Sequence, residues 1–243
     1  MPPRTSRLRA WAELFRLSNL PTVVSNALAG TALALAPRAA AAAFPWRSAG
    51  WISAGAGCLY LAGMALNDAC DASVDRQERP GRPIPSGRIS RLVATIAGLL
   101  LLLAGLNILA LAGRAPAAIG AALVILIVLY DTTHRFWSGS VVLLGLCRAG
   151  VYLAAGAAVV WPPDSPWLLP GAGLLGGYVV ALSLIARHEA GRPARIRIVI
   201  ALLCGISILD ALVLALLQQW LPVVAALGCY FLARLAQRWI RGT

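Results

Sequence analysis

The sequence predicts an all-α protein whose helices cross a membrane about eight times. Three observations lead to this fold class. Of the 243 residues 60% are hydrophobic, only 12% are charged, and the mean hydropathy is +0.78. A soluble domain carries about twice that share of charge. Long apolar runs recur along the whole chain, so the sequence predicts an integral membrane protein rather than a soluble domain with one anchor.

Eight apolar runs approach the length of about 20 residues that a membrane-spanning helix needs. They cover residues 20–36, 49–66, 92–112, 115–130, 141–160, 167–186, 196–217 and 221–240. A cleaved signal peptide is the alternative for the first run, because Ala32-Leu33-Ala34 has the small-residue pattern of a cleavage site. Seven further runs favour a retained span. We expect one transmembrane domain over residues 1–243, with residues 1–19 as a basic cytoplasmic segment.

The arginines predict how the spans are oriented. All 21 basic residues are arginines, against 9 acidic residues. With the N-terminus in the cytoplasm, 17 arginines lie on the cytoplasmic side, and three lie on the other: Arg38, Arg47 and Arg114. Basic residues gather on the cytoplasmic side of membrane proteins, so we expect a bacterial inner-membrane protein with both termini in the cytoplasm. Topology and anionic lipids explain the net charge of +12, and we expect no nucleic-acid partner.

Two weaker patterns concern the internal organisation. The chain reads ERPGRP after the second apolar run and HEAGRP after the sixth. This echo favours two pseudo-repeated four-helix halves around a central cavity. The five cysteines stand singly, without a CxxC pair, so we expect neither disulfides nor a zinc site.

The most informative segment, NDACDASVDRQERPGRPIPSGRISR, covers residues 67–91 directly after the second apolar run. Asn67, Asp71 and Asp75 are spaced by four and therefore share one face of a helix, with Asp68 one position round. Such a row of oxygen ligands suits Mg²⁺, which takes one or two protein carboxylates and leaves its other positions to water and phosphate. A solvated acidic helix end is the alternative, but helix C-termini disfavour acidic side chains.

Five arginines follow the acids: Arg76, Arg79, Arg82, Arg88 and Arg91. Guanidinium groups form forked hydrogen bonds with phosphate oxygens. Acids that hold Mg²⁺, surrounded by arginines, therefore predict a diphosphate-binding site. Membrane orientation alone would also place arginines in this loop, but it gives no reason for the acids.

This NDxxDxxxD pattern, followed by RPGRPIPSG, resembles the UbiA superfamily of intramembrane prenyltransferases. Three more segments are similar to the family: RLSNLPTVVSNALAG (16–30) to its first span, YDTTHRF (130–136) to its Tyr-x-x-x-Lys-Arg stretch, and LLGLCRAGVYLAAG (143–156) to its fifth span. The resemblance covers residues 16–193. It implies ionisation of a prenyl diphosphate donor with Mg²⁺ and transfer of the prenyl group to a hydrophobic or aromatic acceptor within the lipid.

The resemblance also implies roles for single residues. The catalytic set would be Asn67, Asp71 and Asp75. The metal ligands would be Asn67, Asp68, Asp71, Asp75 and Glu189. The diphosphate would be bound by Arg79, Arg82, Tyr130, His134 (in place of the usual Lys), Arg135, Arg148 and Arg187. The acceptor and prenyl pocket would include Arg16, Asn19, Asn26, Tyr152 and Tyr178. For the tyrosines, a packing or interfacial role is the alternative.

The chain departs from the family in two ways. The family has a second acidic motif, DxxxD, after its sixth span, which binds a second Mg²⁺. Here Arg187 and Gly191 occupy the aspartate places and Glu189 is the remaining acid. We therefore expect one Mg²⁺, leave a second open, and expect Arg187 to contact diphosphate directly. The family usually has nine spans, whereas this chain has room for eight. A divergent bacterial subgroup is similar here, so the enzyme is not expected to be inactive.

Polar residues inside the spans give further expectations. A charge such as Arg148, about two turns into the fifth span, costs roughly 2.5–3.5 kcal/mol in the membrane and should face the cavity. Asn107 and Asp210 lie at similar depths in their spans, which predicts a structural hydrogen bond between them. Asn26 either contacts the acceptor or joins two helices.

Two other functions are compatible with a polar membrane protein. A transporter would carry polar residues near the bilayer midplane on broken helices, whereas here they concentrate at one end of the spans. Another Mg²⁺-dependent diphosphate or lipid-headgroup transferase, such as a CDP-alcohol phosphotransferase, would need an Asp-Gly dipeptide that the chain lacks. The sequence sets neither the acceptor nor the oligomeric state.

Overall fold

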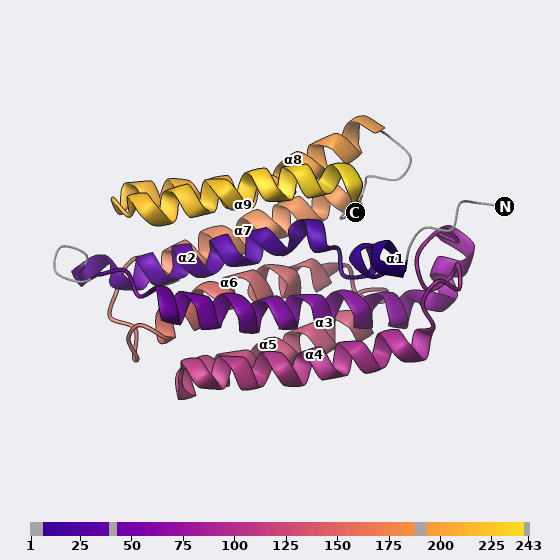
Figure 1. The fold of residues 1–243 in the computed structure, drawn as a ribbon, viewed down its shortest axis with the longest axis horizontal. Coiled ribbons are helices and arrows are strands. Elements are labelled where there is room, and N and C mark those ends of the chain that lie inside the picture. Colours follow the sequence, from indigo (N-terminus) through magenta and orange to yellow (C-terminus); the bar gives the residue numbers. More distant parts are fainter. Residues whose placement is uncertain (1–6, 39–42, 188–192, 241–243) are drawn as a thin grey trace.

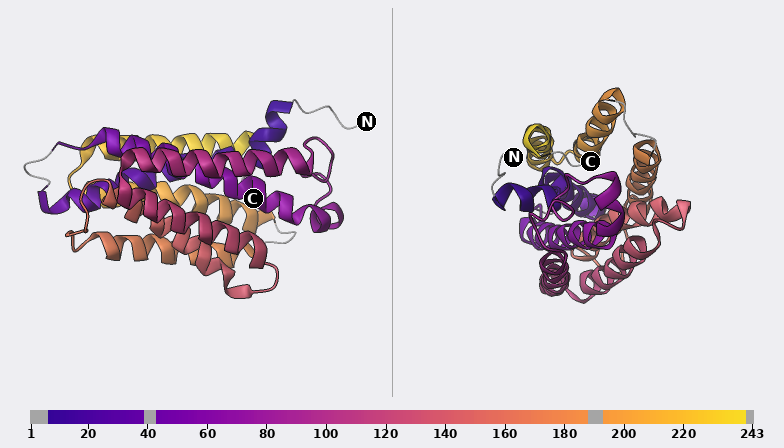
Figure 2. Two further views of the ribbon diagram at one scale, coloured as in Figure 1. Left: turned by 90° about the horizontal axis from the view of Figure 1, so that it is seen from below. Right: turned by 90° about the vertical axis from the view of Figure 1, so that its right-hand side faces the viewer.

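The computed structural model of the protein describes residues 7–38, 43–187 and 193–240. Every regular element in these residues is a helix, which confirms the all-α fold class. Eight helical segments of the described chain are long and apolar enough to cross a membrane, as many as the sequence predicts. They run side by side along the long axis of the bundle (Figures 1 and 2).

The described residues form nine α-helices and three short 3₁₀ helices. In chain order these are α1 (Arg7–Leu14), η1 (Leu17–Asn19), α2 (Leu20–Leu35), η2 (Ala36–Arg38), α3 (Trp46–Glu78), α4 (Arg91–Ala112), α5 (Arg114–Thr133), η3 (Ser138–Ser140), α6 (Val141–Ala157), α7 (Leu168–Arg187), α8 (Pro193–Leu216) and α9 (Trp220–Trp239).

Helix α3 differs most from the predicted span at 49–66. It is one helix of 33 residues and continues from the apolar run to Glu78. The acidic row is therefore the last part of a membrane helix and not a loop. The helix can continue because its polar part packs against α1 and the segment that leads into α4, where Ile84 and Ile89 are buried together with Leu14.

Helix α2 is the most enclosed of the spans. Thirteen of its 16 residues are buried, and it packs against α3, α6, α7, α8 and α9. Close packing is possible because small residues form much of its surface. A Cβ on Gly30 would come within 2.6 Å of the Tyr152 Cα, so glycine lets the α2 and α6 backbones meet. Since α2 contacts all four helices of the second predicted half, the two halves share a large interface; their pseudo-repeat stays a prediction.

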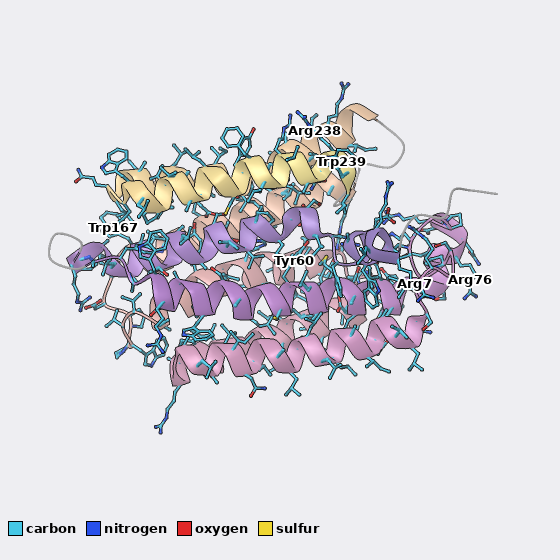
Figure 3. All side chains as sticks on the ribbon, in the orientation of Figure 1. Arg7, Tyr60, Arg76, Trp167, Arg238 and Trp239 are labelled. Carbon is cyan, nitrogen blue, oxygen red and sulfur yellow. The ribbon has the colours of Figure 1, made fainter. Side chains whose placement is uncertain are left out.

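The two ends of the bundle differ in character. Helix α1, the segment after α3 and the C-terminal end of α9 lie together at one end (Figure 1). The labelled Arg7, Arg76 and Arg238 mark this basic end, whereas Trp167 lies at the opposite end (Figure 3). Exposed tryptophans are typical of a membrane interface. The structure thus brings α1 and the end of α9, the first and last described helices, to the side that is rich in arginine.

We predict that this arginine-rich end faces the cytoplasm. A reporter inserted after Ser86, in the exposed loop between α3 and α4, and another fused after Thr243 should both give cytoplasmic signals, because basic residues are retained on that side. A reporter in the α6–α7 loop, after Pro163, is the matched control and should give the opposite signal. An external signal from the first two fusions would contradict this orientation.

Candidate active site

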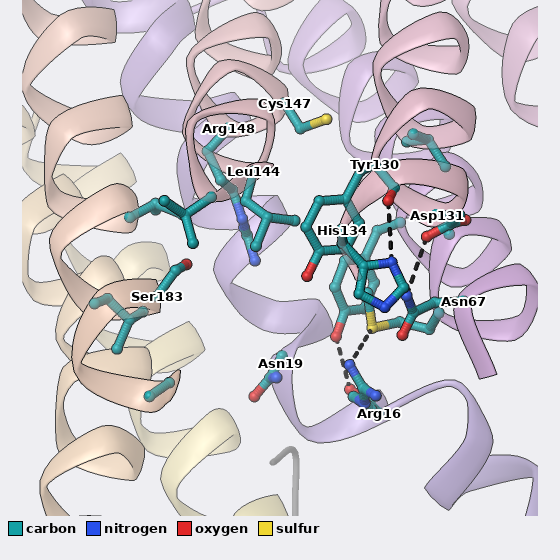
Figure 4. Close-up of a pocket in the computed structure, with 18 of the residues that line it drawn as sticks. Arg16, Asn19, Asn67, Tyr130, Asp131, His134, Leu144, Cys147, Arg148 and Ser183 are labelled. Carbon is teal, nitrogen blue, oxygen red and sulfur yellow. Dashed lines mark hydrogen bonds between the residues drawn. The ribbon is translucent and has the colours of Figure 1, made fainter. Parts of the chain in front are cut away.

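A cavity of about 760 Å³ lies among α2, α3, α5, α6, α7 and α8. The wall of this cavity is charged at one end and mostly apolar elsewhere. Carboxylates and guanidinium groups line the arginine-rich end, and most of the remaining wall is apolar, including Val23, Leu123, Leu144, Val151, Leu182 and Ile206. Figure 4 shows labelled side chains of α3, α5, α6, α7 and the η1 segment around this space. The cavity can thus hold a ligand that is charged at one end and apolar at the other.

The acidic row on α3 forms one side of the polar end. Asn67, Asp71 and Asp75 all line the cavity, as expected for residues spaced by four on one continuous helix. Asp68 points elsewhere: it is 4% exposed and accepts hydrogen bonds from Arg16 at 3.1 Å and Arg82 at 3.4 Å. Its place beside the row makes it a partner of two arginines and not a member of the cavity wall.

Each acid of the row is paired with a cation. The Arg82 Nη1 atom lies 2.5 Å from Asp75 Oδ2. Arg135 donates from Nε to Asp71 Oδ1 at 2.7 Å, and His134 Nε2 lies 3.2 Å from Asp71 Oδ2. These arginines are therefore held beside the acids, where they can turn to a bound phosphate.

His134 lies between Tyr130 and Asp71 at the polar end of the cavity. Its Nδ1 lies 3.1 Å from the Tyr130 carbonyl oxygen, while Nε2 faces Asp71. Both ring nitrogens thus have a hydrogen-bonding partner. The ring also stacks on Tyr130 at a centroid distance of 5.1 Å. His134 is thus fixed beside Asp71 by contacts of both ring nitrogens and of its ring face.

Asp131 is a functional candidate that sequence reasoning missed. It lies in the last turn of α5, lines the cavity, and accepts a hydrogen bond from Asn67 Nδ2 at 3.3 Å. Its other oxygen, Oδ2, is buried and has no hydrogen-bond partner in the described structure. The signal was present in YDTTHRF: Asp131 is an acid in the last turn of α5, where an acid is unfavourable without a partner.

The residues of the polar end fit Mg²⁺. They offer oxygen donors, the ligand type that this ion prefers, and the unpartnered Asp131 Oδ2 is an acceptor that lacks a positive partner. Among the described residues, no three His, Cys, Asp or Glu side chains form a preformed metal cluster. In proteins, Mg²⁺ is usually bound by one or two carboxylates together with substrate phosphate. One or two of the carboxylates of Asp71, Asp75 and Asp131, together with the Asn67 amide oxygen, would hold it, whereas Glu189 lies outside the described residues.

All of the residues expected to bind diphosphate line the cavity: Arg79, Arg82, Tyr130, His134, Arg135, Arg148 and Arg187. Arg187 is anchored at the start of the fifth span, where it donates to the Ser138 carbonyl oxygen and, at 2.7 Å, to Ser140 Oγ. It therefore brings the end of α7 against η3. Arg148 lies apart from the others, near the middle of α6.

The residues expected to contact the acceptor divide into two groups. Arg16 and Asn19 line the cavity. Asn26, Tyr152 and Tyr178 do not line it, which corrects their expected place in the pocket. Their polar atoms are used between helices: the Tyr178 hydroxyl donates to the Leu202 carbonyl oxygen at 2.7 Å and so joins α7 to α8.

Tyr152 and Asn26 belong to a buried polar network around Asp210. This carboxylate is 0% exposed and accepts hydrogen bonds from Ser25 Oγ at 2.5 Å, Asn26 Nδ2 at 2.8 Å and the Tyr152 hydroxyl at 2.6 Å. Each partner is a donor, so the site is complementary to a carboxylate. The network joins α2, α6 and α8.

The predicted bond between Asn107 and Asp210 is wrong. Asn107 is exposed and donates to the Leu103 carbonyl oxygen of its own helix at 2.8 Å. Equal depth in the membrane does not make two helices neighbours: α4 packs against α3 and α5, whereas α8 packs against α2 and α9.

The family model of the UbiA prenyltransferase family matches residues 24–243 of the chain. Two curated relatives are named digeranylgeranylglyceryl phosphate synthase. The one from Ignicoccus hospitalis is 41% identical over 85 residues, which are 35% of this chain and 25% of the relative. The one from Methanoregula boonei is 38% identical over 106 residues, 41% of this chain and 36% of the relative. These matches thus span about a quarter and a third of the relatives' lengths.

Two solved structures share the fold. One, reported for digeranylgeranylglyceryl phosphate synthase in membranes, has a TM-score of 0.62 and 15% identity, covering 97% of this chain and 96% of that one. The other, a UbiA homolog from Archaeoglobus fulgidus bound to GPP and Mg²⁺, has a TM-score of 0.61 and 15% identity, covering 93% and 85%. At this identity the likeness concerns the fold. The family match over nearly the whole chain decides the assignment: the chain belongs to the UbiA prenyltransferase family.

Proposed function

We propose that this chain transfers a prenyl group from a prenyl diphosphate to a lipid-like acceptor, with Mg²⁺ as cofactor. The observation that carries the proposal is the cavity itself. One end has acids and arginines, and most of the remaining wall is apolar. A prenyl diphosphate has the same two parts, a charged diphosphate and an apolar chain. Membership of a prenyltransferase family supports this match.

The residues of the polar end would stabilise the leaving diphosphate. Arg79, Arg82 and Arg135 line the cavity beside the acids, where their N–H groups can donate to phosphate oxygens as negative charge develops. His134 adds a donor next to Asp71. When bound, Mg²⁺ supplies further positive charge to the same oxygens.

The apolar wall would protect the allylic cation that remains. Leu123, Leu144 and Val151 contribute to this wall, and a cavity closed to water prevents hydrolysis of a reactive intermediate. The Tyr130 ring also lines the cavity, and an aromatic face attracts a cation. These side chains thus leave the acceptor as the available nucleophile.

A glyceryl phosphate lipid is the acceptor class that we favour over an aromatic acid. The relatives' printed name describes a product with two geranylgeranyl groups on glyceryl phosphate. The corresponding acceptor is a glyceryl phosphate that already carries one such chain. A transporter is less consistent with the structure, because none of the described spans unwinds in its middle.

Product analysis tests this function. The purified chain would be incubated with Mg²⁺, geranylgeranyl diphosphate and either a monoprenyl glyceryl phosphate or 4-hydroxybenzoate. Mass spectrometry should detect a diprenyl glyceryl phosphate in the first reaction and no prenylated benzoate in the second. Prenylated benzoate alone would contradict the lipid acceptor, and loss of both products in an otherwise folded protein would contradict prenyl transfer.

We predict that Mg²⁺ and diphosphate bind cooperatively. In the described structure Asp71 and Asp75 are paired with Arg135 and Arg82, so a metal alone must displace a guanidinium. When diphosphate is present, the arginines can pair with phosphate and the acids are released. Titration calorimetry should give much tighter Mg²⁺ binding with inorganic pyrophosphate than without it. Pyrophosphate affinity that is unchanged in EDTA would contradict a metal bridge.

We also predict unequal effects at the two acidic segments. Asp71→Asn should lower turnover at least about a hundredfold, because it removes a carboxylate from the proposed metal site. Each loss of about 1.4 kcal/mol of transition-state stabilisation lowers the rate tenfold. Glu189→Gln should cost about tenfold, since this acid has no partner carboxylate at the family's spacing. Asp164→Asn is the matched control, because Asp164 pairs with Arg38 on the surface outside the cavity. Equal, severe losses at Asp71 and Glu189 would indicate two metal ions.

A further inference from the structure

Arg148 is a charged residue in an unusual place. It lies near the middle of α6, between Val141 and Ala157, and lines the cavity. Its neighbours on the same cavity-facing side of α6, Leu144 and Val151, are apolar. A charge at the centre of a membrane helix costs roughly 2.5–3.5 kcal/mol. Such residues are rare and mark binding sites or transport paths by default.

The guanidinium of Arg148 is held in place without being neutralised directly. It donates from Nη1 to Asn26 Oδ1 at 2.8 Å and lies over the Tyr60 ring, 5.7 Å from the centroid. Among the described residues no carboxylate lies within ion-pair distance of it. Arginine has five N–H donors, and Asn26 takes one of them. The others are available to an anion in the cavity (Figure 4).

The nearest compensating charge acts on Arg148 through Asn26. The Asn26 amide turns its oxygen to Arg148 and its nitrogen to Asp210 Oδ2. Only this orientation satisfies both neighbours, because guanidinium has no acceptor and a carboxylate has no donor. Asp210 is fixed in turn by Ser25 and Tyr152. The buried network therefore sets where the guanidinium points.

Arg148 is well separated from the diphosphate end. Tyr60, on which it lies, precedes Asn67, the first residue of the row, by about two turns, or roughly 10 Å along the axis, and Asp71 by about three turns, or roughly 16 Å. The carboxylate whose charge acts on Arg148 is Asp210. Arg148 therefore stands apart from Arg82 and Arg135, which contact the acidic row.

We propose that Arg148 binds the anionic head of the acceptor, a phosphate in an acceptor of the glyceryl phosphate class, while the donor's diphosphate occupies the acidic end. This inference rests on the function proposed above and revises the expected role of Arg148 in diphosphate binding. Asp210, through Asn26, is a positioning residue for this second anion subsite. The planar guanidinium can offer two parallel N–H groups to phosphate oxygens.

Steady-state kinetics separate acceptor binding from donor binding. The full-length protein would be assayed with Mg²⁺, geranylgeranyl diphosphate and a monoprenyl glyceryl phosphate. Arg148→Gln should raise the acceptor KM at least about tenfold, equivalent to about 1.4 kcal/mol, and leave the donor KM within about twofold. Arg148→Lys should raise the acceptor KM by a smaller factor than Arg148→Gln, because lysine keeps the positive charge. Asp210→Asn should raise the acceptor KM in the same direction by a smaller factor.

Asn107→Leu is the matched control, because Asn107 is also a polar residue within a span but is exposed, bonds only its own helix and lies outside the cavity. It should leave both KM values unchanged. The Tm of each variant checks that the fold is intact. A rise in the donor KM for Arg148→Gln would assign Arg148 to the diphosphate site and overturn the proposal. Unchanged KM values would reduce Arg148 to a structural residue, and an unchanged acceptor KM in Asp210→Asn would overturn the positioning role.

A binding measurement works without turnover and so distinguishes failure of this subsite from failure of the proposed function. Decyl phosphate and decanol would be titrated into the protein with Mg²⁺ and saturating inorganic pyrophosphate, which occupies the diphosphate end. The wild type should bind decyl phosphate more tightly than decanol, and Arg148→Gln should lose that preference. Complete displacement of decyl phosphate by pyrophosphate would indicate one anion site and contradict the proposal. The wild-type comparison remains informative if a variant does not fold.

Discussion

The buried network around Asp210 determines how the helices of this protein are arranged. Apolar side chains gain little by leaving lipid for another apolar surface, so directional hydrogen bonds and close backbone contacts fix the register of membrane helices. Asp210 on α8 accepts from Asn26 on α2 and Tyr152 on α6. A carboxylate buried among apolar helices without these donors would be strongly destabilising. These bonds hold α2 in the centre and so set the wall of the cavity.

The position of α2 also explains why the cavity has a cation, Arg148, in its apolar part and a cluster of charges at its other end. Close contact at Gly30 brings α6 against α2, and this packing leaves the Arg148 side chain directed to the cavity and to Asn26. At the other end, η1 follows a residue with left-handed backbone, Arg16 at φ 45°, and the Arg16 side chain reaches Asp68. Helix α2 is thus tied to the central cation Arg148 through Asn26, and the segment that leads into α2 is tied to Asp68, beside the acidic row, through Arg16.

The polar end shows how a membrane protein can concentrate charge without instability. Acids and arginines are present in pairs, and Arg82 contacts both Asp68 and Asp75. Each pair offsets part of the desolvation of its members. The loop that carries Arg82 is held in turn by Arg88, which forms an ion pair with Glu13 of α1. Under the function proposed above, these paired charges would be exchanged for a metal and a diphosphate.

The sequence by itself determined the helical class, the eight spans and the row at Asn67, Asp71 and Asp75, because hydropathy and helical spacing are local properties that survive in any packing. Tertiary structure decided which helices are neighbours and how each is rotated. It paired Asp131 with Asn67, and it directed the Tyr152 hydroxyl to Asp210 and away from the cavity. These contacts depend on the close approach of segments far apart in the chain, which neither periodicity nor depth in the membrane encodes.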